Sequence, residues 1–183
     1  LVDIVEGLPQ GKALDMLEIS PSELECILHG TTVAINAILE RRFPEVALIT
    51  TQGFRHILEI ARQTVPGERG SIYHWVKPSR VVPLERVYEI TERVSASGEV
   101  LVPLDQEQAR TVARQLKADG IEAVAVSLIN SYANTEHEEQ LRRILLEEHP
   151  SCFLAISSET LCEFREYERT LTTCMNAVLM PPA

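Results

Sequence analysis

The 183-residue chain has little basic charge, and this excludes two classes of partner. It carries 17 Lys and Arg residues against 27 Asp and Glu residues, which gives a net charge of −10 and a pI near 5.0. Nucleic acids and anionic membranes bind proteins through clustered basic side chains. We therefore expect neither nucleic acid nor a membrane surface as a partner.

Long hydrophobic runs are also lacking. A membrane-spanning helix needs about 20 consecutive apolar residues, and every apolar run in this chain is much shorter. The N-terminal residues lack the basic stretch followed by an apolar one that a secretory signal shows. The sequence predicts a soluble, cytoplasmic protein.

Cysteine pairs and histidine clusters are absent as well. Cys26, Cys152, Cys162 and Cys174 are scattered and form no CxxC pair, and the five histidines do not have ligand spacing. Free cysteines usually behave as small buried hydrophobic residues, whereas a structural metal site needs closely spaced ligands. We expect buried thiols and no metal bound by this chain alone.

Apolar periodicity indicates the fold class. The runs at 46–50, 123–129 and 153–156 predict buried strands, and 87–94 alternates as a half-exposed strand does. Helical patterns lie between these strands, so we predict an α/β fold with mixed sheets and flanking helices. The 45% hydrophobic content supports one large domain or two small lobes, the latter at 1–84 and 85–183.

The most informative stretch is 29–42, HGTTVAINAILERR, which follows the apolar run 26–28. A strand that ends at a glycine and passes through hydroxyl residues into a helix places free backbone N–H groups and Thr31 and Thr32 together. Asn36 lies among apolar positions of this helix. It is either a structurally hydrogen-bonded amide or a substrate contact beside the two threonines.

A second strand-to-helix loop follows the predicted strand at 46–50. It carries Thr50, Thr51 and Gly53, and a short helix from Arg55 to Arg62 comes next. The resulting β-α-β-α order favours parallel strands whose loops meet at one edge of the sheet. Ligands of open α/β sheets bind at that carboxyl edge.

Turn and capping residues delimit the elements further along the chain. Gly98 suits a hairpin over 95–101, whereas 63–82 fits neither a helix nor a strand period. Asp105 with Gln108, and Thr135 with Glu138, have capping-box spacing and predict two helix starts.

The final predicted helix, 163–180, begins with a run of charges. Arg165 and Arg169 lie one turn apart with Glu166 between them. Such a run is often only a solvated helix face. Alternatively, the two arginines reach an anionic group or carboxylates on neighbouring segments.

Four segments of the chain resemble the N-terminal region of the hydantoinase A and 5-oxoprolinase family, in the same order. They are HGTTVAINAILERR (29–42), VALITTQGFRHILEIARQ (46–63), GIEAVAVSLINSYAN (120–134) and SSETLCEFREYERTLTTCMNAVLMP (157–181). The resemblance implies a partial actin, Hsp70 and sugar-kinase-like (ribonuclease H-like) domain.

The resemblance also implies a chemistry. Family members use ATP and Mg²⁺ to phosphorylate a carbonyl oxygen, which opens hydantoins or 5-oxoproline to attack by water. Related subunits act in acetone and acetophenone carboxylases. A hydantoinase B-type partner subunit is expected, and a homo-oligomer is a further expectation.

Some family features are expected outside this chain. A DxGGT-type phosphate loop should precede Leu1, and the second half of the nucleotide site should follow, so we expect a piece of a longer protein that neither binds ATP well nor turns over alone. Ile35 replaces a usual threonine, and Asn130 stands where histidine is common. An isolated chain that serves only as a subunit-interaction module is the remaining alternative.

The predicted substrate-facing residues are Thr31, Thr32, Asn36, Thr50, Thr51, Arg55, Arg165, Glu166 and Arg169.

Overall fold

The computed structural model of the chain describes residues 44–62 and 80–179, which belong to one compact unit. The predicted strand at 26–28 and helix at 31–42, with Thr31, Thr32 and Asn36, lie outside the described residues, as does most of the irregular stretch 63–82. None of the helices in the described ranges has the length and apolarity that a membrane crossing needs.

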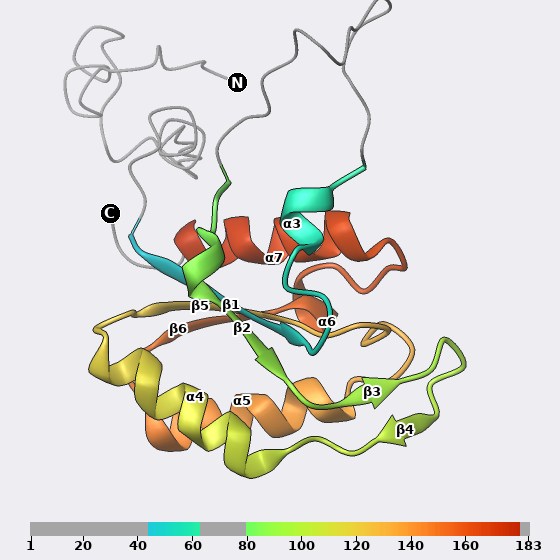
Figure 1. The fold of residues 1–183 in the computed structure, drawn as a ribbon, viewed down its shortest axis with the longest axis horizontal. Coiled ribbons are helices and arrows are strands. Elements are labelled where there is room, and N and C mark those ends of the chain that lie inside the picture. The colour runs from blue at the N-terminus through green and yellow to red at the C-terminus, as the bar shows by residue number, and fades with distance from the viewer. Residues whose placement is uncertain (1–43, 63–79, 180–183) are drawn as a thin grey trace, which may run out of the picture. The chain divides into compact units, whose positions relative to one another are not determined.

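A four-stranded parallel sheet forms the centre of the structure (Figure 1). Its strands are β1 (Val46–Thr51), β2 (Val87–Ile90), β5 (Ala123–Ser127) and β6 (Phe153–Ile156), in the order β2-β1-β5-β6. The predicted strands at 46–50, 123–129 and 153–156 are confirmed, and β1, β2, β5 and β6 pair in parallel. The parallel pairing predicted between 26–28 and 46–50 involves residues outside the described ranges. The two possible lobes, 1–84 and 85–183, would divide the chain after residue 84. β1 precedes this position and the other three strands follow it, so described residues on both sides share one sheet.

Alternating side chains of the sheet pack against two helical layers, one on each face. Ala47 and Ile49 of β1 pack with α4 (Gln106–Ala118) and α5 (Glu136–Glu148), whereas Val46 and Leu48 pack with α3 (Ile57–Ile60) and α7 (Glu166–Leu179). Figure 1 shows α4 and α5 on one face of the sheet and α3 and α7 on the other. Because both faces are covered, every residue of β1 and β5 is buried.

The predicted strand at 87–94 is divided in the structure. β2 ends at Ile90, and β3 (Arg93–Val94) leaves the parallel sheet and pairs with β4 (Val100–Val102) in an antiparallel hairpin. The break falls at Glu92, whose side chain is buried beside the carboxyl end of the sheet. The predicted hairpin around Gly98 is confirmed, with φ +85° at the glycine.

Two helices are shorter than predicted. α3 spans only four residues, and its apolar residue Ile60 is 52% exposed. α7 begins at Glu166 because the preceding Arg165 has φ +84°, outside the helical region. Two short helical turns, η2 (Leu84–Arg86) and α6 (Ser157–Thr160), complete the described elements.

One predicted helix cap is confirmed and the other is wrong. Asp105 caps α4 by accepting a hydrogen bond from the Gln108 backbone N–H at 2.9 Å. At α5, Thr135 makes no side-chain cap bond, and Asn134 instead accepts from the Glu136 N–H. Glu138 does not take part in capping, because its carboxylate is directed into the protein.

The cysteine prediction is correct at two of the three described positions. Cys152 and Cys174 are buried, and burial raises the pKa of the Cys174 thiol to about 12. Cys162 is exposed, because it lies in the segment between α6 and α7.

Candidate functional site at the carboxyl edge of the sheet

Many of the buried polar side chains in the described region lie at the carboxyl ends of the four parallel strands. β1 ends at Thr51, β2 leads to Glu92, β5 leads to Leu128, and β6 leads to Ser157. We call Thr51, Glu92, His137, Glu138, Glu166 and Arg169 the edge cluster. Open α/β sheets bind ligands at this edge, so the contacts of the cluster decide what the site can do.

Thr51 connects β1 to two other elements. Its Oγ1 donates to Glu92 Oε1 and accepts from the Ile129 backbone N–H at 2.9 Å. The other carboxylate oxygen of Glu92 lies 2.7 Å from His137 Nδ1 at the start of α5. All three side chains are 0–3% exposed, so their hydrogen-bonding groups are shielded from water and hold the ends of β1 and β5 together.

Glu138 is a fully buried carboxylate that the structure surrounds with donors. Its Oε1 accepts from the Leu128 N–H at 2.9 Å and from Ser157 Oγ at 2.6 Å, and its Oε2 accepts from the Ser158 N–H at 2.9 Å. A buried carboxylate is tolerated when donors satisfy its oxygens. Glu138 therefore joins the end of β5 to the end of β6.

Arg169 connects α7 to the same segment. Its Nη2 donates to the Leu128 carbonyl at 2.7 Å and forms an ion pair with Glu166, while its Nη1 donates to the Glu163 carbonyl at 3.2 Å. The guanidinium also lies over the Tyr132 ring, 5.4 Å from its centroid. Although an arginine, Arg169 is 0% exposed.

Glu166 differs from the other carboxylates of the cluster because its side chain is 25% exposed. It accepts from the Asn130 N–H at 3.2 Å. Burial raises the pKa of Glu166 above its usual value, although the charge of Arg169 acts in the opposite direction. Glu166 is therefore a hydrogen-bonded carboxylate, partly open to solvent, beside a positive charge.

Two non-glycine residues with left-handed backbones flank this carboxylate. Asn130 has φ +60° and Arg165 has φ +84°. Asn130 is held by its Nδ2, which donates to the Val94 carbonyl at 2.9 Å. Strained residues persist where surrounding contacts fix them, and such residues are concentrated at functional sites.

The structure brings together only part of the predicted set. Thr51, Glu166 and Arg169 converge on the segment Leu128–Asn130. Thr50 points to the opposite face of the sheet, where its Oγ1 is buried without a hydrogen-bond partner among the described residues.

The two remaining described residues of the set do not contact this segment. Arg55 donates to the Leu84 carbonyl at 2.9 Å. Arg165 is exposed and lies over the Phe164 ring, 5.5 Å from its centroid. The sequence predicted Arg165 and Arg169 as a pair, but the non-helical backbone of Arg165 separates them.

The buried members of the edge cluster do not fit a nucleotide or a metal. The Thr51 hydroxyl uses its proton and an acceptor position on protein groups. Arg169 donates to two carbonyls and Glu166 through Nη1 and Nη2, and only its buried Nε lacks a partner among the described residues. In the described part of the chain, no three His, Cys, Asp or Glu residues are grouped to hold a metal ion. The buried part of the cluster therefore positions the edge, and Glu166 and Asn130 are the residues here that solvent partly reaches.

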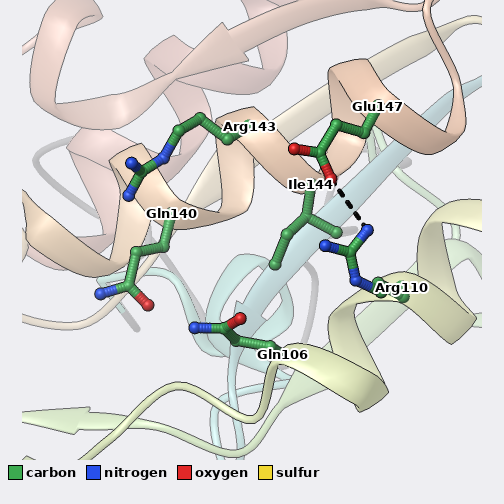
Figure 2. Close-up of a pocket in the computed structure, with 6 residues that line it drawn as sticks. All are labelled: Gln106, Arg110, Gln140, Arg143, Ile144 and Glu147. Carbon is green, nitrogen blue, oxygen red and sulfur yellow. Dashed lines mark hydrogen bonds and ion pairs between the residues drawn. The ribbon is translucent and has the colours of Figure 1, made fainter.

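A polar hollow of about 280 Å³ lies elsewhere, between α4 and α5. Figure 2 shows Gln106, Gln140 and Arg143 around it, with Arg110 paired to Glu147 at 2.9 Å. Arg110 and Arg114 also bind Glu148 and hold its pKa at about 2. We call Arg110, Arg114, Glu147 and Glu148 the helix-pair network. No residue of the helix-pair network is buried. The hollow beside it is therefore a weaker candidate site than the edge cluster.

Comparison with known proteins identifies the family. Residues 4–149 match the sequence profile of the hydantoinase/oxoprolinase N-terminal region. The chain belongs to the hydantoinase/oxoprolinase family. The resemblance drawn from the four sequence segments is thus confirmed.

Relatives within the family act on different substrates. The acetophenone carboxylase gamma subunit of Aromatoleum aromaticum is 34% identical over 97% of this chain, and 5-oxoprolinase 1 of Arabidopsis thaliana is 32% identical over 90% of it. The crystal structure of the ATP-dependent caprolactamase from Pseudomonas jessenii matches with a TM-score of 0.82 and 30% identity over 93% of this chain. This chain spans 26%, 14% and 25% of these three proteins, respectively.

Sequence reasoning missed three members of the edge cluster. Glu92 lies in an alternating strand pattern that predicts a solvated side chain, and His137 and Glu138 lie in the first turn of a helix, where acidic residues are ordinary. Their partners are between 10 and 45 residues away in the sequence. No local spacing rule connects residues so far apart.

Proposed function

We propose that this chain is the N-terminal part of an ATP-dependent hydrolase that opens cyclic amides of the hydantoin, N-methylhydantoin or 5-oxoproline type. The family membership supports this proposal, as do relatives that include a 5-oxoprolinase and an ATP-dependent caprolactamase. The single structural observation that carries it is the convergence of Thr51, Glu166 and Arg169 on the loop after β5.

In this proposal the buried groups fix the loop and the partly exposed groups meet the substrate. Thr51 and Arg169 hold the backbone at Leu128 and Ile129 through its N–H and C=O groups. Glu166 and Asn130 then present a carboxylate and an amide at a defined place. Preorganised polar groups of this kind stabilise charge that develops during attack on a carbonyl.

ATP and Mg²⁺ belong to the proposal for the longer protein. Phosphorylation of the amide oxygen would make a stable ring carbon susceptible to water. The described residues supply no cradle for a triphosphate, so we assign ATP and Mg²⁺ to segments outside them, in a nucleotide fold of the actin, Hsp70 and sugar-kinase type. Thr31, Thr32 and Asn36 remain proposed substrate contacts.

A ketone carboxylase subunit is the second candidate, favoured by the 34% identity to the acetophenone carboxylase gamma subunit. Both proposed reactions begin with phosphorylation of a carbonyl oxygen, so the edge cluster suits either one. That relative is also one subunit of its enzyme, which supports a partner subunit here. We propose a partner of the hydantoinase B type.

Substrate profiling separates the two candidates. The protein made from its own gene, together with its partner subunit, is incubated with ATP, Mg²⁺ and either 5-oxoproline, hydantoin or caprolactam, or with a ketone and bicarbonate. We expect ATP-dependent appearance of the ring-opened acid. Carboxylation of the ketone without any ring opening would contradict the hydrolase proposal.

A matched pair of variants tests the site. Glu166→Gln removes the partly exposed carboxylate of the edge and is expected to lower kcat by about a hundredfold, a typical loss for a positioned acid–base or charge-stabilising group. Glu147→Gln removes a carboxylate of the helix-pair network and should leave kcat unchanged. Wild-type turnover in the Glu166 variant would remove the edge cluster from the proposal.

A further inference from the structure

The outer strand of the hairpin, β4, differs from every other strand of the described region. Each of its three residues is exposed: Val100 by 38%, Leu101 by 56% and Val102 by 40%. Successive side chains of a strand point to opposite faces. Consequently, both faces of β4 are partly open to solvent, although all three side chains are apolar.

The outer backbone edge of β4 is also open. β4 pairs with β3 on one side, and no described strand lies on its other side. Figure 1 shows the hairpin extending beyond the carboxyl ends of the parallel strands, with β4 farther from the sheet than β3. An apolar edge with unpaired N–H and C=O groups is a template for another strand.

The rest of the hairpin is held firmly in place. Asn130 Nδ2 donates to the Val94 carbonyl and Asn134 Nδ2 donates to the Gly98 carbonyl, both at 2.9 Å. Gly98 packs so closely that a Cβ built on it would lie 2.9 Å from the Ala133 carbonyl oxygen. A two-stranded hairpin is marginally stable alone, so these contacts preorganise β4 with its edge exposed.

Residues next to β4 limit the length of strand that can pair with it. Glu99 precedes β4 and Pro103 follows it, and Pro103 has no N–H group to donate. Both are exposed. The available edge is therefore three residues long, with a carboxylate at one end.

We propose that an extended apolar strand from a part of the longer polypeptide outside residues 1–183 pairs with β4. A stable interface between separate proteins takes about 20–30 residues a side, far more than three. A tethered strand needs less contact because its effective concentration is high. This chain spans only 14–26% of the relatives described above, so in those proteins most of the polypeptide lies outside the matched region.

Site-specific cross-linking tests the identity of the occupant. The photoreactive residue p-benzoylphenylalanine replaces Leu101 in the protein made from its own gene, and in a control it replaces Leu146, which is 45% exposed on α5. We expect an intramolecular cross-link from position 101, mapped by mass spectrometry to a peptide outside residues 1–183, and no such link from position 146. Cross-links to a distant peptide within residues 1–183, to a second copy or to another subunit, or none at all, would each overturn the proposal.

A charge substitution gives an independent measurement. Leu101→Lys is expected to lower the Tm of the same protein by roughly 1–2 °C, because a given loss of free energy shifts the Tm less in a longer protein. Leu146→Lys should leave the Tm unchanged, and equal Tm values for all three proteins would contradict the inference. Neither experiment requires ATP or substrate, so their results are separate from the test of the proposed function.

Discussion

The edge cluster and the helix-pair network are both built from carboxylates and cationic side chains, but their surroundings differ. Glu92, His137, Glu138 and Arg169 are 0–3% exposed, whereas Arg114 and Glu147 have exposed side chains of about 60%. Unpaired polar groups are costly in a water-excluded site, and exposed ion pairs contribute little. The comparison shows that similar chemical groups have different energetic roles according to burial.

The largest expected effect is that of Glu138→Ala. This change leaves two backbone N–H groups and the Ser157 hydroxyl without their acceptor. At about 1–3 kcal/mol for each lost partner, and with partial relaxation, we expect a decrease of about 3–5 kcal/mol in the free energy of unfolding, measured by chemical denaturation. Glu139→Ala, at a more exposed neighbouring position, is the control and should change it by less than about 0.5 kcal/mol.

A smaller effect separates two adjacent threonines that are equally buried. Thr51→Val removes a hydroxyl that donates to Glu92 and accepts from the Ile129 N–H, so we expect a loss of about 1–3 kcal/mol. Thr50→Val removes a hydroxyl without a partner among the described residues and should be neutral or slightly stabilising. Equal losses in the two variants would show that burial, rather than hydrogen bonding, determines the effect.

The difference between these threonines also indicates what the sequence could predict. The strand at 46–50 followed from its apolar, β-branched residues. Which hydroxyl is engaged depends on Glu92 and Ile129, which are 41 and 78 residues away from Thr51. Local patterns therefore predict the elements and the edge at which they meet, but not the long-range partners of each side chain.

Glu138 shows that a local sequence pattern can also predict a contact that the folded protein does not make. Its spacing from Thr135 fits a capping box, a local pattern that is favourable in an isolated helix. In the folded protein, the donors at Leu128, Ser157 and Ser158 compete for the carboxylate. Asn134 caps the helix instead, so tertiary contacts override the local preference.

The pH dependence of stability should have opposite signs at Glu166 and Glu148. Burial raises the pKa of Glu166 above 4.5, so its favourable contribution is present below pH 4.5 and is lost as the pH rises through the raised pKa. Hydrogen bonds from Arg114 and Arg110 lower the pKa of Glu148 to about 2, so its contribution is present above pH 4.5 and is lost as the pH falls toward 2.

The free energy of unfolding, measured over a pH series, tests the opposite signs expected for Glu166 and Glu148. Relative to wild type, Glu166→Gln should gain stability as the pH rises above 4.5, and Glu148→Gln should gain stability as the pH falls below it. Parallel curves for the two variants would contradict the assigned signs.

The smallest expected effect is that of Arg114→Ala in the helix-pair network. Arg114 donates two hydrogen bonds of 2.9 Å to Glu148, but its side chain is 61% exposed. We expect only a small decrease in the free energy of unfolding, below that of Thr51→Val, and a smaller one in high salt. A loss comparable with that of Glu138→Ala would remove the distinction between the two clusters.

The position of β1 has a consequence for synthesis of the protein. β1 precedes both of its neighbours in the chain, and it pairs with β5, whose first residue is Ala123. During synthesis, the β1 segment VALITT therefore leaves the ribosome before β5 has been made. Until then, its apolar side chains and unpaired backbone groups are exposed to non-native contacts. We expect a chain that ends before β5 to aggregate. The time between synthesis of β1 and synthesis of β5 is therefore the time when a chaperone is most needed.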